Sequence, residues 1–387
     1  MTQESGHGGW LESYFQQHLE EMLGFLGWLV SHESMSRVPE ATSHLAQQFG
    51  IRLREIGAAI ELISDSHSGS SVLARFDHAC KDQSADQLLI VGHLDTVWPM
   101  GTLEGRPFRL EQGRAYGPGI FDMKAGLTIA FFAMRALKEA GYRTMRPVAF
   151  LITCDEETGS VYNRTLVEAE GRRSHAALVL EPPIPGGNLK TERKGVGEFE
   201  LVITGKPAHA GNDPLGGISA ITELAHQILA INAMGDYERG TTLNVGVVNG
   251  GVLSNVIPAE ARARIDMRYQ TEEEGARITR ALGGLRPVLD GARIEVRGGI
   301  NRPPFARTPA SQALFEHARA LAIEIGFDVG EGSVGGGSDG NFIAALGVPV
   351  LDGLGVDGAG AHAEHEHILI DDIPRRAALL ARLIETV

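Results

Sequence analysis

The sequence predicts a mixed α/β fold, in which a larger domain with a mostly parallel sheet is interrupted by an inserted α+β domain with an antiparallel sheet and two helices. Two observations predict it. In the first half of the chain and again near its end, helical patterns alternate with continuous apolar runs, which is typical of a parallel sheet covered by helices. Between them the order becomes strand–helix–strand–strand–helix–strand, as in a small antiparallel unit. A chain of 387 residues is long enough for two domains.

Continuous apolar runs mark the strands of the larger domain. Pro147–Thr153 and Ala176–Leu180 are strongly apolar, as strands buried on both faces of a sheet are. Leu11–Leu29 has apolar residues at helical spacing and is expected to be one amphipathic helix. Met1–Gly9 before it is expected to be a disordered leader. The other elements expected in this half are helices at Thr42–Gly57 and Ala125–Ala140, and strands at Ala59–Ile63, Ser71–Phe76 and Gln87–Val91.

The inserted domain is expected to span residues 195–303, so that the larger domain consists of residues 1–194 and 304–387. An antiparallel sheet of this kind buries one face under its helices and leaves the other face for a partner. Gly298–Thr308 is expected to be the linker back to the larger domain. The elements expected here and in the tail are strands at Phe199–Thr204, Thr242–Val248, Arg262–Tyr269 and Arg293–Arg297, and helices at Ile218–Ala233, Thr271–Leu289, Ser311–Ile325 and Asp372–Thr386.

Charge and cysteine content exclude several classes of partner. The net charge of −14 argues against nucleic acid and against an anionic membrane surface. The apolar run Met22–Val30 is too short to span a bilayer. Cys80 and Cys154 form neither a metal motif nor a disulfide framework, and two buried thiols are typical of a reducing compartment. We therefore expect a cytoplasmic protein.

Five short segments combine acids and histidines, most of them just after apolar runs. Ligands of open α/β sheets bind beyond the carboxyl ends of the strands, so these segments are candidates for one site. The first contains His93 and Asp95. Residues i and i+2 of an extended backbone point to one face, which suits an imidazole that binds a metal and a carboxylate that orients it. A single His-x-Asp pair also occurs incidentally.

The second and third segments are acidic. Asp122 lies between a glycine-rich turn and the long apolar helix, where it either caps the helix or bridges two cations. Asp155, Glu156 and Glu157 directly follow a buried strand. Three adjacent carboxylates repel one another. They form either a solvated acidic turn, or a site in which one carboxylate binds a cation and another holds a proton as general base, and in such a site the repulsion is relieved.

The fourth and fifth segments complete the ligand set. Glu181 ends another apolar run, and the loop from Gly360 contains His362, His365 and His367. We expect His365 and His367 to be surface histidines and His362 to be a ligand. Nitrogen and oxygen ligands without thiolate suit zinc, with manganese or cobalt as alternatives. Two cations ~3.5–4 Å apart that share a carboxylate would form a hydrolytic site.

These residues lie in motifs that resemble the metallopeptidase family of glutamate carboxypeptidase, aminoacylase, succinyl-diaminopimelate desuccinylase and peptidase T. The resemblance covers nearly the whole chain, with the motifs in family order, and is closest to the glutamate carboxypeptidase branch. The matching motifs are Gly92-His93-Leu94-Asp95-Thr96, Gly117–Gly126 around Asp122, Asp155–Ser160, Gly205-Lys206-Pro207-Ala208-His209-Ala210-Gly211, Ser254-Asn255-Val256-Ile257-Pro258 and Gly335-Gly336-Gly337-Ser338-Asp339.

The resemblance implies a role for each residue of the metal site. His93 and Glu181 would bind one Zn²⁺, and Glu157 and His362 would bind a second. Asp122 would bridge the two ions, next to a cis peptide bond with Met123. Asp95 would orient His93, and Glu156 would be the general base. Co²⁺ or Mn²⁺ are the alternative ions.

The resemblance also implies roles for the inserted domain, which would act as a lid and join two subunits into a homodimer. His209 would reach the partner subunit's active site and stabilise the oxyanion. Asn255 and Arg268 would grip the free carboxylate of the substrate. Gly336 and Gly337, in the turn Gly335–Ser338, would contact the substrate backbone. An acidic side chain of the substrate would meet Lys190, Arg193 or Lys194, between which the spacing does not choose.

The expected activity is hydrolysis of the amide bond to a C-terminal amino acid, with glutamate as the first candidate, in an N-acyl or peptide-like substrate. One alternative uses the same two-metal site for deamination or for amidino or ureido hydrolysis. Another, of a different class, is a metal-dependent binding protein without catalysis. The presence of Glu156 together with the whole ligand set argues against that second alternative.

Overall fold

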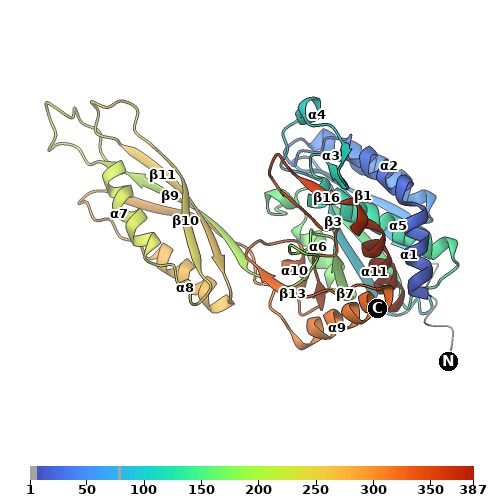
Figure 1. The fold of residues 1–387 in the computed structure, drawn as a ribbon. Helices are drawn as coiled ribbons and strands as arrows, with labels where there is room; N and C mark the ends of the chain where they lie inside the picture. The colour runs from blue at the N-terminus through green and yellow to red at the C-terminus, as the bar shows by residue number, and fades with distance from the viewer. Residues whose placement is uncertain (1–6, 77–79) are drawn as a thin grey trace. The chain divides into compact units, whose positions relative to one another are not determined.

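The computed structural model describes residues 7–76 and 80–387, with the side chains described from Trp10 onward. Two compact units make up this part of the chain (Figure 1). Unit 1 contains the described residues up to Glu192 together with Arg307–Val334 and Ser338–Val387. Unit 2 contains Arg193–Ala306 and the short turn Gly335–Gly337. The insertion expected at residues 195–303 therefore falls inside unit 2, which also takes in that turn.

The main sheet of unit 1 has the strand order β1-β2-β6-β3-β7-β14. Its strands are β1 (Ala59–Asp65), β2 (Gly69–Phe76), β6 (Val148–Thr153), β3 (Gln87–His93), β7 (Ser174–Val179) and β14 (Val350–Leu351). The pairs from β6 to β14 are parallel, and β1 and β2 join antiparallel at one edge. Every residue of β3 and β6 is buried, as their continuous apolar runs predict. The mostly parallel sheet is confirmed.

Helices cover this sheet and form the main core of unit 1. Those that contribute to the core are α1 (His7–Gln17), α2 (Leu19–Val30), α3 (Pro39–Glu55), α5 (Ala125–Glu139), α9 (Pro309–Ile325) and α11 (Ile373–Thr386). Unit 1 also contains α6 (Arg164–Gly171), α10 (Gly340–Ala344) and the short α4 (Thr102–Gly105), which has no buried residue. Leu88 and Ile90 of β3 join the core that α3, α5, α9 and α11 build. Leu89 and Val91, which point to the opposite face, are also buried.

The amino-terminal segment differs from the prediction in two respects. Leu11–Leu29 is not one helix, because α1 ends at Gln17 and α2 begins at Leu19. His18 between them has φ −99° and ψ 10°, outside helical values, and its ring lies 2.8 Å from the Tyr14 carbonyl oxygen. In addition, α1 begins at His7, so residues 7–9 are helical rather than part of a disordered leader. The rest of the expected leader lies outside the described residues.

Two small sheets connect distant segments of unit 1. Strand β8 (Leu189–Arg193) pairs with β13 (Glu331–Val334). The second sheet has the order β15-β16-β5-β4, with β15 (Gly358–Ala359), β16 (His367–Leu369), β5 (Arg114–Tyr116) and β4 (Arg109–Glu111). In it His367 pairs with Tyr116. This pairing joins the segment that leads to Asp122 to the segment that follows His362.

Unit 2 is an antiparallel sheet of order β10-β11-β9-β12 with two helices packed on it (Figure 1). Its elements are β9 (Gly195–Thr204), α7 (Ala220–Asn232), β10 (Thr242–Gly250), β11 (Glu260–Tyr269), α8 (Glu272–Gly283) and β12 (Arg293–Arg302). The element order is the predicted one. The two largest errors in the predicted bounds are that α8 ends at Gly283 rather than Leu289, and that Gly298–Arg302 extends β12 instead of forming a linker. Strand β9 also begins earlier than predicted, at Gly195 rather than Phe199.

Both cysteines are buried thiols. Within residues 7–76 and 80–387, no helix combines the length and the apolar character needed to cross a membrane.

Candidate active site

His93 is the last residue of β3, and its side chain is buried. Its Nδ1 lies 2.9 Å from the backbone carbonyl oxygen of Asp95, which can only accept a hydrogen bond, so Nδ1 carries the proton and donates. Nε2 is left to face two carboxylates, Asp122 Oδ1 at 3.2 Å and Glu181 Oε1 at 3.6 Å. This tautomer suits an imidazole that binds a cation through Nε2.

Asp95 contacts more than the histidine that it was expected to orient. Its Oδ1 lies 3.5 Å from His93 Nδ1. The two carboxylate oxygens also accept hydrogen bonds from the backbone amides of Glu156 and Glu157, each at 3.2 Å. Asp95 is fully buried. Its carboxylate therefore holds the acidic turn after β6 against the end of β3.

Asp122 lies between the two imidazoles. Its Oδ1 is 3.2 Å from His93 Nε2, and its Oδ2 is 3.5 Å from His362 Nε2. It belongs to the turn Ile120–Lys124, where its φ of −119° and ψ of 92° are not helical, and its peptide bond to Met123 is cis. The capping alternative is wrong, because the residue that caps α5 is Lys124, and it makes no side-chain capping bond.

The three acids after β6 have different surroundings. Asp155 accepts hydrogen bonds from the Tyr162 amide at 2.8 Å and from Asn163 Nδ2 at 2.6 Å, so it stabilises the turn itself. Glu157 faces the fifth segment, with Oε2 3.0 Å from His362 Nε2. Glu156 is buried, and a carboxylate oxygen of it lies within 4.8 Å of ligand atoms of His93 and Glu181.

The fifth segment contributes one histidine to this cluster. His362 is half exposed and has φ +61°, in the left-handed region that residues other than glycine rarely adopt. His367 Nδ1 lies 2.8 Å from the His365 carbonyl oxygen, and the His367 ring packs near Tyr116. In the part of the chain that the structure describes, neither His365 nor His367 pairs with an acid of the cluster.

The charges of this cluster favour a bound cation. Burial disfavours the charged form of His93, but hydrogen bonds with Asp122, Asp95 and Glu181 outweigh it and raise the pKa of the imidazole well above its ordinary value. Hydrogen bonds with Asp122 and Glu157 raise the pKa of His362 likewise. Burial raises the pKa of the Glu157 carboxyl. Carboxylates outnumber the two imidazoles, so a cation fits the cluster.

The donor set also fits a metal. Ligand atoms of His93, Glu156 and Glu181 lie within 4.8 Å of one another, and those of His93, Asp122 and Glu157 do so as well. Imidazole nitrogen and carboxylate oxygen are ligands that zinc accepts. His362 belongs to neither of these two groups and reaches the cluster through Glu157 and Asp122.

Glu366 is a buried acid in this region that the sequence patterns did not single out. It accepts hydrogen bonds from the amides of Gly119, Phe121 and Asp122 and from the Trp98 indole. The one local signal is its spacing from Ile368, since residues i and i+2 of an extended segment share a face and both are buried. That spacing predicts burial but not these partners.

In unit 2, His209 and Asn255 lie beside each other. The Ala210 amide donates a hydrogen bond to the Asn255 carbonyl at 3.0 Å, and the backbones of His209 and Val256 form an isolated antiparallel β-bridge. His209 Nδ1 accepts hydrogen bonds from the amides of Gly211 and Asn212, each at 3.1 Å. The proton of the neutral ring is therefore on Nε2, and the exposed side chain presents an N–H donor.

Arg268 lies elsewhere in unit 2, near the end of β11. Its guanidinium pairs with Asp266 on the same face of the strand, with Nη2 2.7 Å from Oδ2 and Nε 2.9 Å from Oδ1. Its Nη1 lies 3.4 Å from the Gly335 carbonyl oxygen. The structure thus brings Arg268 to the turn Gly335–Gly337.

Arg193 contacts the same turn. It is buried, and its Nη1 donates to the carbonyls of Gly336 at 3.1 Å and Gly337 at 3.2 Å. Lys190 is buried in β8, where its backbone pairs with Asp352, and Lys194 is half-buried. Among the three basic residues left open by the spacing, Arg193 thus has a side-chain contact with the glycine turn.

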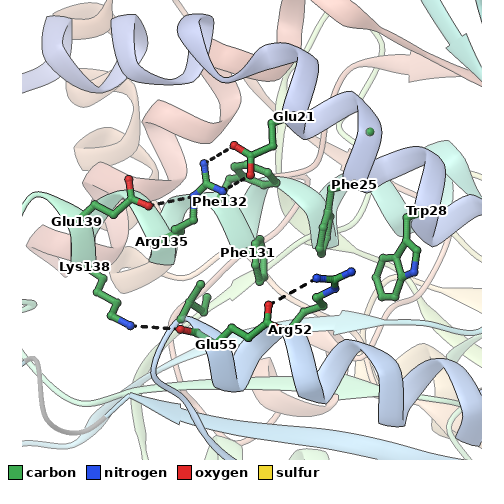
Figure 2. Close-up of a pocket in the computed structure, with 12 residues that line it drawn as sticks. Glu21, Phe25, Trp28, Arg52, Glu55, Phe131, Phe132, Arg135, Lys138 and Glu139 are labelled. Carbon is green, nitrogen blue, oxygen red and sulfur yellow. Dashed lines mark hydrogen bonds and ion pairs between the residues drawn. The ribbon is translucent and has the colours of Figure 1, made fainter.

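A cavity of about 610 Å³ opens between α2, α3 and α5 (Figure 2). Phe25, Trp28 and Phe131 contribute aromatic walls. The two arginines that line it are paired with glutamates, Arg52 with Glu55 and Arg135 with Glu21 and Glu139. None of its lining residues belongs to the cluster around His93. Since its arginines are already paired and converge on no common point, we assign it no ligand.

Comparisons with known proteins agree with the fold. Residues 89–386 match Peptidase family M20/M25/M40. The chain is 34% identical over 309 residues to carboxypeptidase G2 from Pseudomonas sp. (strain RS-16), covering 79% of this chain and 74% of that protein. It is 29% identical over 322 residues to a succinyl-diaminopimelate desuccinylase from Psychrobacter arcticus, covering 78% of each.

Two solved structures share the fold. Aminopeptidase PepT from Bacillus cereus matches with a TM-score of 0.75 at 24% identity, covering 95% of this chain and 98% of that one. The M20 family metallo-carboxypeptidase Sso-CP2 from Sulfolobus solfataricus matches with a TM-score of 0.74 at 18% identity, with the same coverage.

The fold and these relatives define a hydrolase of the metallopeptidase class. The chain belongs to Peptidase family M20/M25/M40, because the match to that family covers well over half of its length. The family is metal-dependent, typically with zinc, and acts on peptide or amide bonds. The resemblance drawn from the motifs is confirmed.

Proposed function

We propose that this protein is a two-metal amidohydrolase that releases the C-terminal amino acid from an N-acyl or peptide-like substrate. The observation that carries the proposal is the position of Asp122, whose two carboxylate oxygens face two different imidazoles, His93 Nε2 at 3.2 Å and His362 Nε2 at 3.5 Å. A carboxylate shared in this way is the bridging ligand that a two-metal hydrolytic site requires.

The proposed ligands divide into two sets around Asp122. His93 and Glu181 would hold one Zn²⁺, and His362 and Glu157 the other, with Co²⁺ or Mn²⁺ as alternative ions. Such ions, when bound, lower the pKa of water and polarise a carbonyl oxygen. Asp95 would keep His93 in the tautomer that leaves Nε2 available, since its backbone carbonyl accepts a hydrogen bond from Nδ1–H.

Glu156 is the proposed general base. It would take a proton from the attacking water and later deliver it to the leaving nitrogen, so that the amine departs neutral. Its backbone amide donates to Asp95 Oδ1, and an oxygen of its carboxylate lies within 4.8 Å of ligand atoms of His93 and Glu181. A carboxylate near the ligands and held by its own backbone suits proton transfer.

His209 is the proposed oxyanion donor. Its Nδ1 already accepts two backbone hydrogen bonds, so Nε2–H is available to the substrate carbonyl as negative charge develops on the oxygen. Asn255 lies beside it, and both would act on the same substrate.

The positions of His209 and Arg268 within unit 2 support a homodimer with shared sites. Glu260 pairs with Thr204 at one end of β11, and Arg268 pairs with Val196 near the other. Those ends are about 27 Å apart, at ~3.4 Å per residue. His209 follows Thr204, the last residue of β9, and Asn255 precedes Glu260, the first residue of β11. Both residues therefore lie beyond the Thr204–Glu260 end of the sheet, which is opposite to the end with Arg268. A small substrate cannot span this distance, so we propose that His209 and Asn255 serve the partner subunit.

Arg268 is the proposed clamp for the free carboxylate of the released amino acid, because its planar fork binds two oxygens at once, as it does with Asp266. Gly336 and Gly337 would contact the substrate backbone. Glutamate as the released residue rests on the resemblance to the glutamate carboxypeptidase branch, with Arg193, which donates to the carbonyls of the glycine turn, as the candidate for its acidic side chain. We propose a cytoplasmic location from the two buried thiols.

The test combines metal content with product analysis. We expect protein purified without chelators to carry two metal ions per chain, and to release free amino acid from a panel of N-acyl amino acids, dipeptides and folate-like compounds. Release of ammonia instead would favour deamination or amidino hydrolysis at the same site. A protein with metal but no turnover on either assay would support the binding-protein alternative. Metal content well below two per chain would contradict the proposal.

A further inference from the structure

Glu366 accepts hydrogen bonds from four N–H groups that belong to two separate segments of unit 1, the turn Gly119–Asp122 and the loop with Trp98. Its Oε1 accepts from the amides of Phe121 at 3.0 Å and Asp122 at 3.1 Å. Its Oε2 accepts from the amide of Gly119 at 2.9 Å and from Trp98 Nε1 at 2.8 Å. The residue is only 1% exposed. A carboxylate so deeply buried is stable because each oxygen is satisfied.

The amides that Glu366 accepts from belong to the turn that presents Asp122. This turn starts at Gly119, whose φ of +69° is left-handed, and no side chain of its own caps it. Asp122 departs from helical geometry inside it. Backbone N–H groups at such a turn need acceptors when they are buried. Glu366 supplies them from a loop that lies more than 240 residues later in the chain.

The same loop carries His362. It folds back on itself through hydrogen bonds from the Ala363 amide to Gly360 at 2.9 Å and from the Glu366 amide to Ala363 at 3.0 Å. Gly360 has φ +85°, and a Cβ there would lie 2.9 Å from the Glu366 amide nitrogen. The geometry of the loop thus ties His362 closely to the backbone position of Glu366.

We propose that Glu366 is a positioning residue that holds the carboxylate of Asp122 and the imidazole of His362 in one fixed arrangement for metal binding. The inference rests on the proposed two-metal site. Glu366 is not one of the proposed metal ligands. It acts through the backbone of Asp122 on one side and through the loop to His362 on the other.

Glutamine is the most informative replacement. Because each oxygen of Glu366 accepts two N–H groups, a carboxamide would set its NH₂ against two donors in either orientation. Glu366→Gln preserves the shape of the side chain, removes its charge and replaces one acceptor oxygen with an NH₂ donor. Glu364→Gln is the matched control, since Glu364 lies exposed on the same loop. Trp98→Phe removes one of the four donors and keeps an aromatic ring.

The experiment titrates Zn²⁺ and Co²⁺ into metal-free wild type and these variants, with a chromophoric chelator as competitor, and records the Co²⁺ absorption spectrum. We expect Glu366→Gln to bind metal about 10- to 100-fold more weakly, as loss of outer-sphere partners does elsewhere, with an altered Co²⁺ spectrum. Trp98→Phe should weaken binding less, and Glu364→Gln should match wild type.

Wild-type affinity and an unchanged Co²⁺ spectrum in Glu366→Gln would overturn the inference. If that variant does not fold, judged by circular dichroism of the metal-free protein, unchanged affinity and spectrum in Trp98→Phe would overturn it instead. A wild type that binds no metal would refute the two-metal site itself. The two failures can be told apart. If only the inference about Glu366 is wrong, wild type and variant both bind metal with the same affinity.

Discussion

Asp95 contacts two parts of the candidate site through different atoms. Its backbone carbonyl accepts a hydrogen bond from His93 Nδ1–H, and its carboxylate oxygens accept hydrogen bonds from the amides of Glu156 and Glu157. The end of β3 and the turn after β6 are therefore held by one fully buried residue. Through these hydrogen bonds, Asp95 fixes the distance between the proposed metal ligand His93 and the proposed general base Glu156.

The first residue-scale prediction concerns Glu156. Removing its carboxylate in Glu156→Ala removes the proposed proton carrier, so kcat should fall by roughly 10²- to 10⁴-fold. Metal content should stay at the wild-type value, because the proposed ligands are other residues. Steady-state kinetics with the best substrate of the panel and emission spectrometry of the same sample measure both quantities.

Glu364→Ala is a suitable control, because Glu364 is exposed. Turnover by Glu156→Ala at the wild-type rate would contradict the assigned mechanism. Loss of metal together with activity would instead make Glu156 a ligand, in line with its position near His93 and Glu181.

At the scale of secondary-structure elements, three neighbouring parallel strands bring the candidate residues together. β3 pairs with β6 on one side, where His93 lies opposite Thr153, and with β7 on the other, where Val91 lies opposite Val179. Parallel strands end at the same edge of a sheet, so the segments that follow them meet there. His93, the acidic turn and Glu181 are neighbours for this reason.

Helix α8 in unit 2 gives a prediction about acid stability. Glu274 accepts hydrogen bonds from Arg277 at 2.7 Å and from Thr241 Oγ1 at 2.7 Å. Those from Arg277 contribute most to lowering its pKa from 4.5 to about 2. Because the folded-state pKa lies below the unfolded one, the stabilisation is complete above about pH 4.5 and is lost as the pH falls towards 2.

We therefore expect Glu274→Gln to destabilise unit 2 most near neutral pH and to differ less and less from wild type between pH 4.5 and 2. Hydrogen exchange of α8 amides, compared between the two proteins at each pH, reports unit 2 locally. Glu273→Gln, at an exposed position in the same turn, is the control and should leave α8 unchanged. A destabilisation by Glu274→Gln that is constant across this pH range would contradict the prediction.

At the scale of the whole molecule, the length of the sheet in unit 2 is the main argument for active sites shared between two subunits. Its sheet separates His209 and Asn255 from Arg268 by about 27 Å along β11, from ~3.4 Å per residue. Exposed apolar residues lie near the His209 end, among them Val247, Val248, Val252 and Leu253. They line or continue the edge strand β10, where a second chain can cover them.

Subunit mixing tests this arrangement. Chains with His209→Ala and chains with Glu156→Ala should each be nearly inactive. Mixed dimers should contain one complete site, formed by Glu156 of the first chain and His209 of the second. With equal amounts and random exchange, half of the dimers are mixed, so about a quarter of wild-type activity should return.

Exchange is verified by native mass spectrometry with one chain carrying a tag. Each variant incubated alone under the same conditions is the control and should stay inactive. Proven exchange without any recovery of activity would refute the sharing of sites between subunits.

The local patterns of the sequence determined much of this protein. Continuous apolar runs predicted the buried strands β3 and β6, because the period of apolar residues reports burial directly. The element order of unit 2 followed from the same patterns. The motifs selected His93, Asp122, Glu157 and His362, which the structure brings together from segments far apart in the chain. The patterns failed where an element ends, as at His18 and Gly283.

Only the tertiary structure decided which remote groups each buried acid contacts. Glu366 has an ordinary sequence context, yet it satisfies the amides around Asp122, and Asp95 holds the turn of Glu156 as well as the ring of His93. Arg193 contacts the glycine turn, which lies 143 residues later in the chain. Periodicity records whether a side chain is buried, but a buried carboxylate takes its partners from chain segments that only the packed fold brings within hydrogen-bonding distance.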